Sequence, residues 1–262
     1  MSILSFLFRR KKLKIGIALG SGGAKGFAHL GALKALEENG IEFDVIGGTS
    51  IGSIVGAFYA DGYSATDVYH LISNLNFREM ITGIPYNMDM SGIFGVLNRE
   101  IGGKSIEELK KPYLAVATDS ATMQEVVFTS GRASTAMCAS SCMLPYFKKF
   151  ADENGRLLID GAYVNSIPAD RVKEKLFADY VIGVDLSAHV ERASDGQLDA
   201  REKGYKYADI MITPDLKEYS ALSIHKRHDM YEAGYISAME KMEQIKKDYA
   251  LLRAGKKIKK RN

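Results

Sequence analysis

The stretch Val45-Ile46-Gly47-Gly48-Thr49-Ser50-Ile51-Gly52-Ser53 decides how the rest of the chain is interpreted. It predicts an apolar strand ending near Ile46, a glycine-rich turn and a helix that starts at Ile51. Its centre reads G-x-S-x-G, with Ser50 in the middle position. A serine nucleophile needs a sharp strand-to-helix turn, and the flanking glycines leave room for one. Small residues also form such turns for packing alone, so the pattern by itself leaves both interpretations open.

The chain before this stretch predicts a β-α-β-α opening. A buried strand is expected over Lys14–Leu19, a glycine loop over Gly20–Gly26 and a helix over Phe27–Asn39. Because such a unit makes neighbouring strands parallel, the loop and Ser50 are expected at the carboxyl ends of two adjacent strands. Ligands bind at this edge in open α/β sheets.

The glycine loop permits three interpretations. A phosphate-binding P-loop fails because Ala24 precedes Lys25 and Gly26 follows it. A dinucleotide fingerprint starting at Gly20 fails because Lys25 occupies a glycine position, so a nucleotide-binding enzyme is disfavoured. The third interpretation is an oxyanion hole, in which backbone N–H groups at a helix start face a negatively charged oxygen. This interpretation fits best with a serine one strand away.

A second chemical landmark is the segment Arg156–Ala162. An apolar strand ends at Asp160, and Gly161 turns the chain directly after it. An aspartate at this position can reach a nucleophile on a neighbouring strand, although aspartates in turns are also common for local reasons.

The remaining pattern is regular except between residues 61 and 105. There, a helix is expected over Asp67–Leu75, and residues 81–94 are typical of either a flexible apolar cover or an ordinary long connection. Further elements are expected as strands over residues 113–118, 125–129, 156–159, 181–185 and 210–212, and as helices over residues 132–142 and 228–253.

The 262 residues are enough for one large α/β domain with a buried core, and the hydrophobic content of 46% is ordinary for a globular protein. The two cysteines, Cys138 and Cys142, make a disulfide framework unlikely and favour a reducing compartment. They are expected to be two buried small side chains. Neither a metal site nor a calcium loop of ordinary spacing is predicted.

The net charge of +3 is concentrated at the chain ends, in Arg9–Lys14 and Lys256–Arg261. No apolar run reaches the roughly 20 residues that span a bilayer, and Ile3–Phe8 is too short for a signal-peptide core. This apolar hexamer beside a basic run is typical of contact with an anionic membrane, but a frayed solvated terminus fits equally well. We therefore predict a cytoplasmic protein, with peripheral contact at the inner membrane face left open.

The motifs occur in the order found in patatin-like phospholipases, and the sequence resembles that family. The family signature is a G-G-G-x-R/K-G loop, then G-x-S-x-G, then D-G-G/A. The corresponding segments here are Ser21–Gly26, Gly48–Gly52 and Asp160–Ala162. The resemblance covers roughly residues 14–245, is of the bacterial type and extends to the catalytic domain of neuropathy target esterase.

Two loop positions depart from the signature. Ser21 replaces the first glycine but still supplies a backbone N–H, so an oxyanion hole remains feasible. Lys25 stands where arginine is commoner, and a lysine donates as a point charge instead of a planar fork.

The resemblance implies a three-layer α/β/α patatin-like fold with a mostly parallel central sheet. It implies an N-terminal extension over residues 1–13, a catalytic domain over residues 14–253 and a basic tail over residues 254–262. Ser50 would be the nucleophile and Asp160 the base that accepts its proton. The oxyanion hole would comprise Gly22, Gly23, Ala24 and Lys25, with motif support from Gly48, Gly52, Gly161 and Ala162.

The implied function is a serine lipid acyl hydrolase of the phospholipase A, lysophospholipase or carboxylesterase type. It needs no cofactor, and its partner is a lipid ester and not a nucleic acid; the oligomeric state is left open. One alternative within this class is a Ser–His–Asp triad using His189, His225 or His228. His29 and Ser140 are expected to pack or to support the loop. The alternative class is a non-catalytic or regulatory lipid-binding protein of the same fold.

Overall fold

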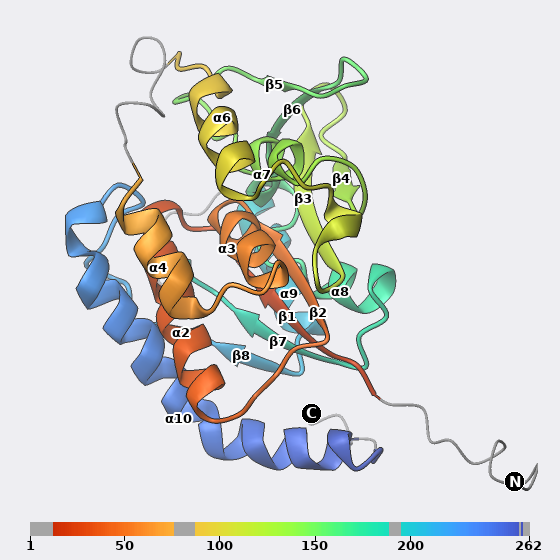
Figure 1. Ribbon diagram of the computed structural model, residues 1–262, viewed down its shortest axis with the longest axis vertical. Coiled ribbons are helices and arrows are strands. Elements are labelled where there is room, and N and C mark those ends of the chain that lie inside the picture. The colour runs from red at the N-terminus through yellow and green to blue at the C-terminus, as the bar shows by residue number, and fades with distance from the viewer. Residues whose placement is uncertain (1–12, 76–86, 189–194, 257, 259–262) are drawn as a thin grey trace, which may run out of the picture.

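The computed structural model describes residues 13–75, 87–188, 195–256 and 258 (Figure 1). Its sheet has eight strands, and five of them form a parallel core in the order β3-β2-β1-β7-β8. These strands are β1 (Ile15–Leu19), β2 (Val45–Thr49), β3 (Tyr113–Asp119), β7 (Tyr180–Val184) and β8 (Ile210–Ile212). The antiparallel strands β4 (Glu125–Phe128), β5 (Phe150–Ala151) and β6 (Leu157–Asp160) extend the sheet at its β3 end. The predicted mostly parallel sheet is therefore confirmed.

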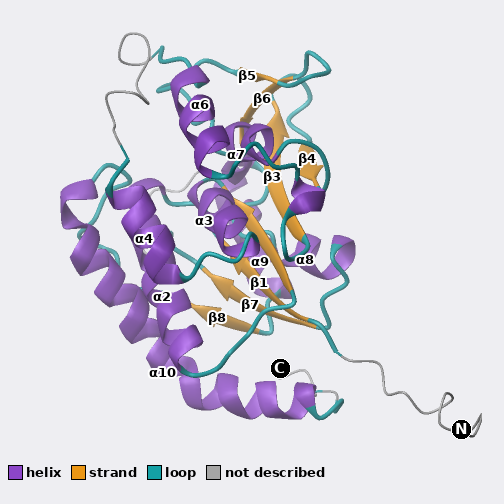
Figure 2. Cartoon of the chain, viewed as in Figure 1, coloured by secondary structure: helices purple, strands orange, loops and turns teal. Residues whose placement is uncertain are grey.

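Helices cover both faces of this sheet (Figure 2). One face is packed by α2 (Phe27–Glu38), α3 (Ile51–Ala60), α7 (Ala133–Ser140) and α10 (Arg227–Arg253), with α4 (Ala65–Ser73) and α6 (Ser91–Glu100) beside them. The other face is packed by α8 (Ala169–Lys175) and α9 (Asp195–Tyr207). Ile15, Ile17 and Leu19 of β1 point to the first layer, whereas Ala18 points to the second. The three-layer α/β/α arrangement is thus present.

Four elements were not predicted from the sequence: α6, α8, α9 and the two-residue β5. Helix α6 begins within residues 81–94, where a cover or a long connection was expected, and residues 76–86 lie outside the described part. Short or strongly polar helices have a weak hydrophobic periodicity, so the sequence gives little signal for them. Packing against the core stabilises them instead. Residues 1–12 of the expected N-terminal extension and most of the basic tail also lie outside the described residues. Within the described residues, no helix combines the length and apolar character needed to cross a membrane.

Helix α10 crosses α2 so closely that Gly234 is required at the contact. A Cβ atom at Gly234 would lie 1.9 Å from the carbonyl oxygen of Ala28. We expect Gly234→Ala to lower the free energy of unfolding by about 1–3 kcal/mol, because the helices must separate to admit a methyl group. In a domain of this size that corresponds to a fall in melting temperature of several degrees, measurable by calorimetry.

Gly95→Ala is the matched control, because Gly95 is also in a helix but a Cβ there meets nothing within 4 Å. Helix propensity predicts that this change raises stability by up to about 1 kcal/mol. Equal effects of the two substitutions would contradict a close α2–α10 crossing.

Candidate active site

The ends of β2 and β6 lie next to each other along β3, and the candidate active site is at this position. Strand β2 runs parallel to β3 and ends with Thr49 opposite Val116. Strand β6 runs antiparallel to β3 and ends with Asp160 opposite Ala117, the next residue of β3. Because the two strands approach from opposite directions, Ser50, directly after β2, lies against Asp160 at the end of β6.

Ser50 occupies a strained turn between β2 and α3, as the G-x-S-x-G pattern predicts. Its φ of 55° and ψ of −127° lie in a region that costs a non-glycine residue about 1–3 kcal/mol. A Cβ at Gly48 would lie 2.2 Å from the carbonyl oxygen of Gly52, and one at Gly52 would lie 2.2 Å from that of Leu19. Both glycines are therefore needed for the strand, the turn and the helix to pack this closely.

Ser50 and Asp160 form a direct hydrogen bond. Ser50 Oγ donates to Asp160 Oδ2 at 2.6 Å, and the two residues are only 8% and 3% exposed. The backbone N–H of Ala162 donates to the other oxygen, Oδ1, at 2.8 Å, and Thr118 Oγ1 donates to the Asp160 carbonyl at 2.8 Å. Gly161 is placed so that a Cβ would lie 2.1 Å from the Val116 carbonyl oxygen. The carboxylate is thus fixed, with one oxygen directed at the serine.

The buried position of Asp160 changes its acidity. Loss of solvation raises the pKa of its carboxyl group to about 6, although the hydrogen bonds from Ser50 and Ala162 act in the opposite direction. A carboxylate with this pKa is a better proton acceptor than an ordinary aspartate and is still largely ionised at neutral pH.

The glycine loop faces the serine across a pocket of about 260 Å³. This pocket is lined by Gly22, Gly23, Ser50 and Asp160, together with Ser21, Met143, Leu144, Ala162, Tyr163 and Ala221. Among the described residues, the N–H groups of Gly22 and Gly23 have no hydrogen-bond acceptor. The other two predicted donors are engaged: Ala24 N–H donates to the Ala221 carbonyl at 2.8 Å, and Lys25 N–H donates to the Gly22 carbonyl at 3.2 Å.

Histidine does not contact the serine or the aspartate in the described part of the chain. His225 and His228 are exposed, and His189 lies outside the described residues. His29 is fully buried beneath the loop, where its Nε2 donates to the Gly20 carbonyl at 2.7 Å. Burial lowers the pKa of His29 to about 4, so its ring is neutral near pH 7. This geometry favours loop support for His29.

Ser140, at the end of α7, contributes a contact that the sequence pattern does not reveal. Its Oγ accepts the Ser50 N–H at 2.8 Å and donates to the Val116 carbonyl at 2.5 Å. The Ser50 N–H is therefore used to hold the strained turn against β3. The only available sequence signal was the Ala-Ser-Ser run before Pro145, which gives no contact partner.

We expect Ser140→Ala to lower kcat about 10- to 100-fold for any reaction of Ser50, because the buried Ser50 N–H loses its acceptor. Ser134→Ala is the control: Ser134 is equally buried on α7, but its Oγ donates to Asn98. Both changes should cost similar stability in chemical denaturation, whereas kcat should fall only for Ser140→Ala. Equal kcat values for the two variants would contradict a positioning role.

Both cysteines are buried and unpaired, as expected. Within the described residues, no group of three or more His, Cys, Asp or Glu side chains is arranged to hold a metal ion.

The fold and this site define an α/β protein that presents a serine on a strained strand-to-helix turn, hydrogen bonded to a buried aspartate. A family model described as patatin-like phospholipase matches residues 17–173. The chain belongs to the patatin-like phospholipase family, and the predicted resemblance is thereby confirmed.

Similar proteins carry related names. The chain is 30% identical over 256 residues to "Patatin-like phospholipase domain-containing protein 6" of Mus musculus, covering 88% of this chain and 18% of that protein. It is 32% identical over 191 residues to "Neuropathy target esterase sws" of Drosophila melanogaster, covering 66% of this chain and 14% of that protein. The chain thus spans less than a fifth of the length of these relatives.

A solved structure shares the fold. VipD from Legionella pneumophila superposes with a TM-score of 0.63 at 13% sequence identity, covering 89% of this chain and 67% of that chain. At this identity the likeness supports the patatin-like architecture and nothing finer.

Proposed function

We propose that the chain is a serine lipid acyl hydrolase that works with a Ser50–Asp160 dyad. The observation that carries this proposal is the 2.6 Å hydrogen bond from Ser50 Oγ to the buried Asp160 carboxylate. Beside it lie the N–H groups of Gly22 and Gly23, which have no acceptor among the described residues. The words phospholipase and esterase in the names of the relatives support an acyl ester as substrate. Phospholipids, lysophospholipids and simpler glycerides all have such a bond.

The geometry supports a two-step reaction. As Ser50 Oγ attacks the ester carbonyl carbon, its proton passes to Asp160 Oδ2. The negative charge that develops on the carbonyl oxygen is stabilised by the N–H groups of Gly22 and Gly23, and one such donor contributes about 3–4 kcal/mol. The C–O bond then breaks, and the leaving alcohol takes the proton from Asp160.

Water completes the cycle. The oxygen of a water molecule attacks the carbonyl carbon of the acyl-enzyme, and Asp160 accepts a proton from that water molecule. The tetrahedral intermediate collapses, Ser50 regains its proton from Asp160, and the carboxylic acid leaves. Within the protein, Ser50 and Asp160 are therefore the two groups that this reaction needs for proton transfer.

Release of fatty acid from a panel of lipids tests the proposal. Purified protein is incubated with phosphatidylcholine, lysophosphatidylcholine and monoacylglycerol, and free fatty acid is measured by mass spectrometry. We expect at least one of these lipids to be hydrolysed at a rate proportional to the enzyme concentration. Saturable binding of these lipids with no release of acid would instead favour the non-catalytic lipid-binding alternative.

We further propose a cytoplasmic location with peripheral contact to an anionic membrane through residues 1–12, whose structure lies outside the described part. The basis is the apolar run Ile3–Phe8 followed by Arg9, Arg10, Lys11 and Lys12. The fraction of protein that sediments with phosphatidylglycerol-containing liposomes should fall at least severalfold when residues 1–12 are deleted. Equal sedimentation of both proteins would rule out this segment as the contact.

A further inference from the structure

Asn165, which is fully buried, is hydrogen bonded to the neighbours of both members of the dyad. Its backbone N–H donates to the carbonyl of Gly161, the residue directly after Asp160, at 2.9 Å. Its own carbonyl accepts the hydroxyl of Thr49, the residue directly before Ser50, also at 2.9 Å. A single residue therefore connects the end of the strand that carries the base to the end of the strand that carries the nucleophile.

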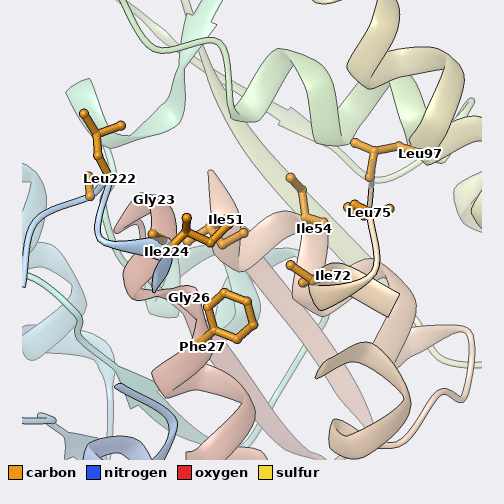
Figure 3. A pocket seen from close by; sticks show the side chains of 12 residues that line it. Gly23, Gly26, Phe27, Ile51, Ile54, Ile72, Leu75, Leu97, Leu222 and Ile224 are labelled. Carbon is orange, nitrogen blue, oxygen red and sulfur yellow. The ribbon is translucent and has the colours of Figure 1, made fainter. Parts of the chain in front are cut away.

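The next residue, Ser166, holds the glycine loop. Its carbonyl accepts the N–H of Ser21, the residue before Gly22, at 3.0 Å, and the hydroxyl oxygens of Ser21 and Ser166 lie 2.8 Å apart. On its other side the loop packs against the nucleophile turn, because Gly26 lies against the Ile51 side chain beside a second, apolar pocket of about 290 Å³ (Figure 3). The segment formed by residues 165 and 166 thus contacts all three parts of the site: the nucleophile turn, the base and the glycine loop.

The side chain of Asn165 is itself anchored by a sheltered ionic cluster. Its amide nitrogen donates to Asp170 Oδ1 at 2.7 Å and to Glu125 Oε1 at 3.0 Å, and these two acidic side chains are only 6% and 12% exposed. Arg171 donates to Glu125 Oε2 from Nε at 3.0 Å and from Nη2 at 2.7 Å. Because an ionised carboxylate only accepts, the amide nitrogen of Asn165 must face both acids. Turning it away would leave buried charge without a donor, so Asn165 is held in one orientation.

We propose that Asn165 is a positioning residue for the dyad, which sets the distance between Ser50 and Asp160 through its bonds to Thr49 and Gly161. This inference rests on the proposed function and adds to it a residue that does not touch the reacting atoms. Ser50 lies on a strained turn, and strain of this kind persists only where the surrounding contacts hold it. Since a misplacement of about 1 Å costs roughly 100-fold in rate, loss of these bonds lowers catalysis without any loss of substrate contacts.

Two substitutions of Thr49 separate the hydrogen bond from packing. Thr49→Val keeps the shape of the side chain but loses the hydroxyl that donates to Asn165, whereas Thr49→Ser keeps the hydroxyl and loses a methyl group. For p-nitrophenyl octanoate, kcat should fall about 10- to 100-fold in Thr49→Val with KM within about threefold of wild type, and Thr49→Ser should recover most of that loss. A packing role predicts the opposite order, because Thr49→Ser leaves the larger void. The opposite order, or equal kcat values, would overturn the proposal.

Asn165→Ala removes the anchored amide, and Asp248→Ala is its matched control. Asp248 is 3% exposed and accepts hydrogen bonds from Tyr180 and Gln244 at the amino end of β7, whereas Ser50 follows the carboxyl end of β2. Both variants should be less stable in urea, but kcat should fall about 30- to 100-fold only in Asn165→Ala. Equal kcat values for these two variants would contradict a specific effect of Asn165 on the dyad.

The ionisation of Asp160 gives a readout that needs no turnover. The hydrogen bond from Ser50 favours the ionised carboxylate, so a longer distance between the two side chains raises the pKa of Asp160. In an NMR titration of isotope-labelled aspartate, with the signal assigned by Asp160→Asn, the pKa should rise by about 0.5 to 1 in Thr49→Val and return towards the wild-type value in Thr49→Ser.

The titration and the kinetics together separate failure of this inference from failure of the proposed function. Wild-type ester hydrolysis, with kcat and the pKa of Asp160 both unchanged in Thr49→Val, would overturn the positioning role while the hydrolase stands. The expected rise of the pKa in a protein that hydrolyses no ester would support the positioning of Ser50 and Asp160 by Asn165 and overturn the hydrolase.

Discussion

Ser50→Ala should lower kcat/KM for ester hydrolysis by at least about 10⁴-fold while the protein stays folded. Removing the nucleophile of a serine hydrolase leaves only the contribution of binding and of the oxyanion donors, which accounts for losses of this size. The fold should persist because alanine meets the same backbone restriction as serine at φ 55°. The measurement is steady-state hydrolysis of p-nitrophenyl octanoate, with folding checked by circular dichroism.

The control for Ser50→Ala is Ser237→Ala, which changes a buried serine on α10 that lines neither pocket. This variant should keep kcat/KM within about twofold of wild type, since substitutions away from the site rarely affect chemistry. Substantial activity in folded Ser50→Ala would assign the nucleophile to another residue.

Asp160→Asn should lower kcat/KM by about 10³- to 10⁴-fold, a loss of the size seen when the acid of a serine triad is changed. The physical reason lies in the two hydrogen bonds of the carboxylate. The amide oxygen can keep the bond from Ala162 N–H, which leaves the amide nitrogen facing Ser50 Oγ. Since that nitrogen donates and cannot accept a proton, the serine keeps its own. Activity of Asp160→Asn close to wild type would mean that the base lies elsewhere.

The pH dependence of Asp160 gives this prediction a distinct signature. Because the base must be ionised, wild-type kcat/KM should fall as pH drops and reach half its plateau near pH 6. An ordinary aspartate would give half the plateau near pH 4. A half-maximum near pH 4 would therefore contradict the buried, proton-accepting role of Asp160.

The free energy of unfolding should change with pH in the direction opposite to kcat/KM. Since burial raises the pKa of Asp160 above its unfolded value, the folded state binds more protons than the unfolded state between about pH 4 and pH 6. The free energy of unfolding should fall as pH rises through this window. Asp160→Asn lacks this ionisation, so above pH 6 it should be more stable than wild type by about 1–3 kcal/mol. Urea denaturation at pH 5 and pH 8 measures the difference.

The sequence predicts the parts of the site that local chemistry determines. The apolar run before Ser50 and the glycines around it predict a strand-to-helix turn, and Ser50 is found on one. The run before Asp160 likewise predicts a strand, and the structure has β6 there. Both signals are short-range, because an apolar run and a following glycine turn depend only on neighbouring residues.

What the sequence does not predict depends on contacts between distant segments. The head-to-head meeting of β2 and β6 on β3 is a matter of strand direction and register, which no local pattern encodes. The Ser140–Ser50 bond requires α7 to end beside β3. The engagement of Ala24 N–H requires Ala221, which lies far along the chain. Tertiary packing determines all three contacts, so they can be identified from the folded structure but not from the sequence.

The most direct test of the account is the covalent product of a fluorophosphonate, a reagent that phosphonylates activated serines. Wild-type protein is treated with an alkyl fluorophosphonate at pH 8, digested and mapped by mass spectrometry. The account predicts one modified serine, Ser50, with labelling slowed at least about 10³-fold in Asp160→Asn because the base that activates the nucleophile is gone. Labelling of Ser140, Ser141 or another serine at an equal rate, or equal labelling of Asp160→Asn, would contradict the Ser50–Asp160 dyad.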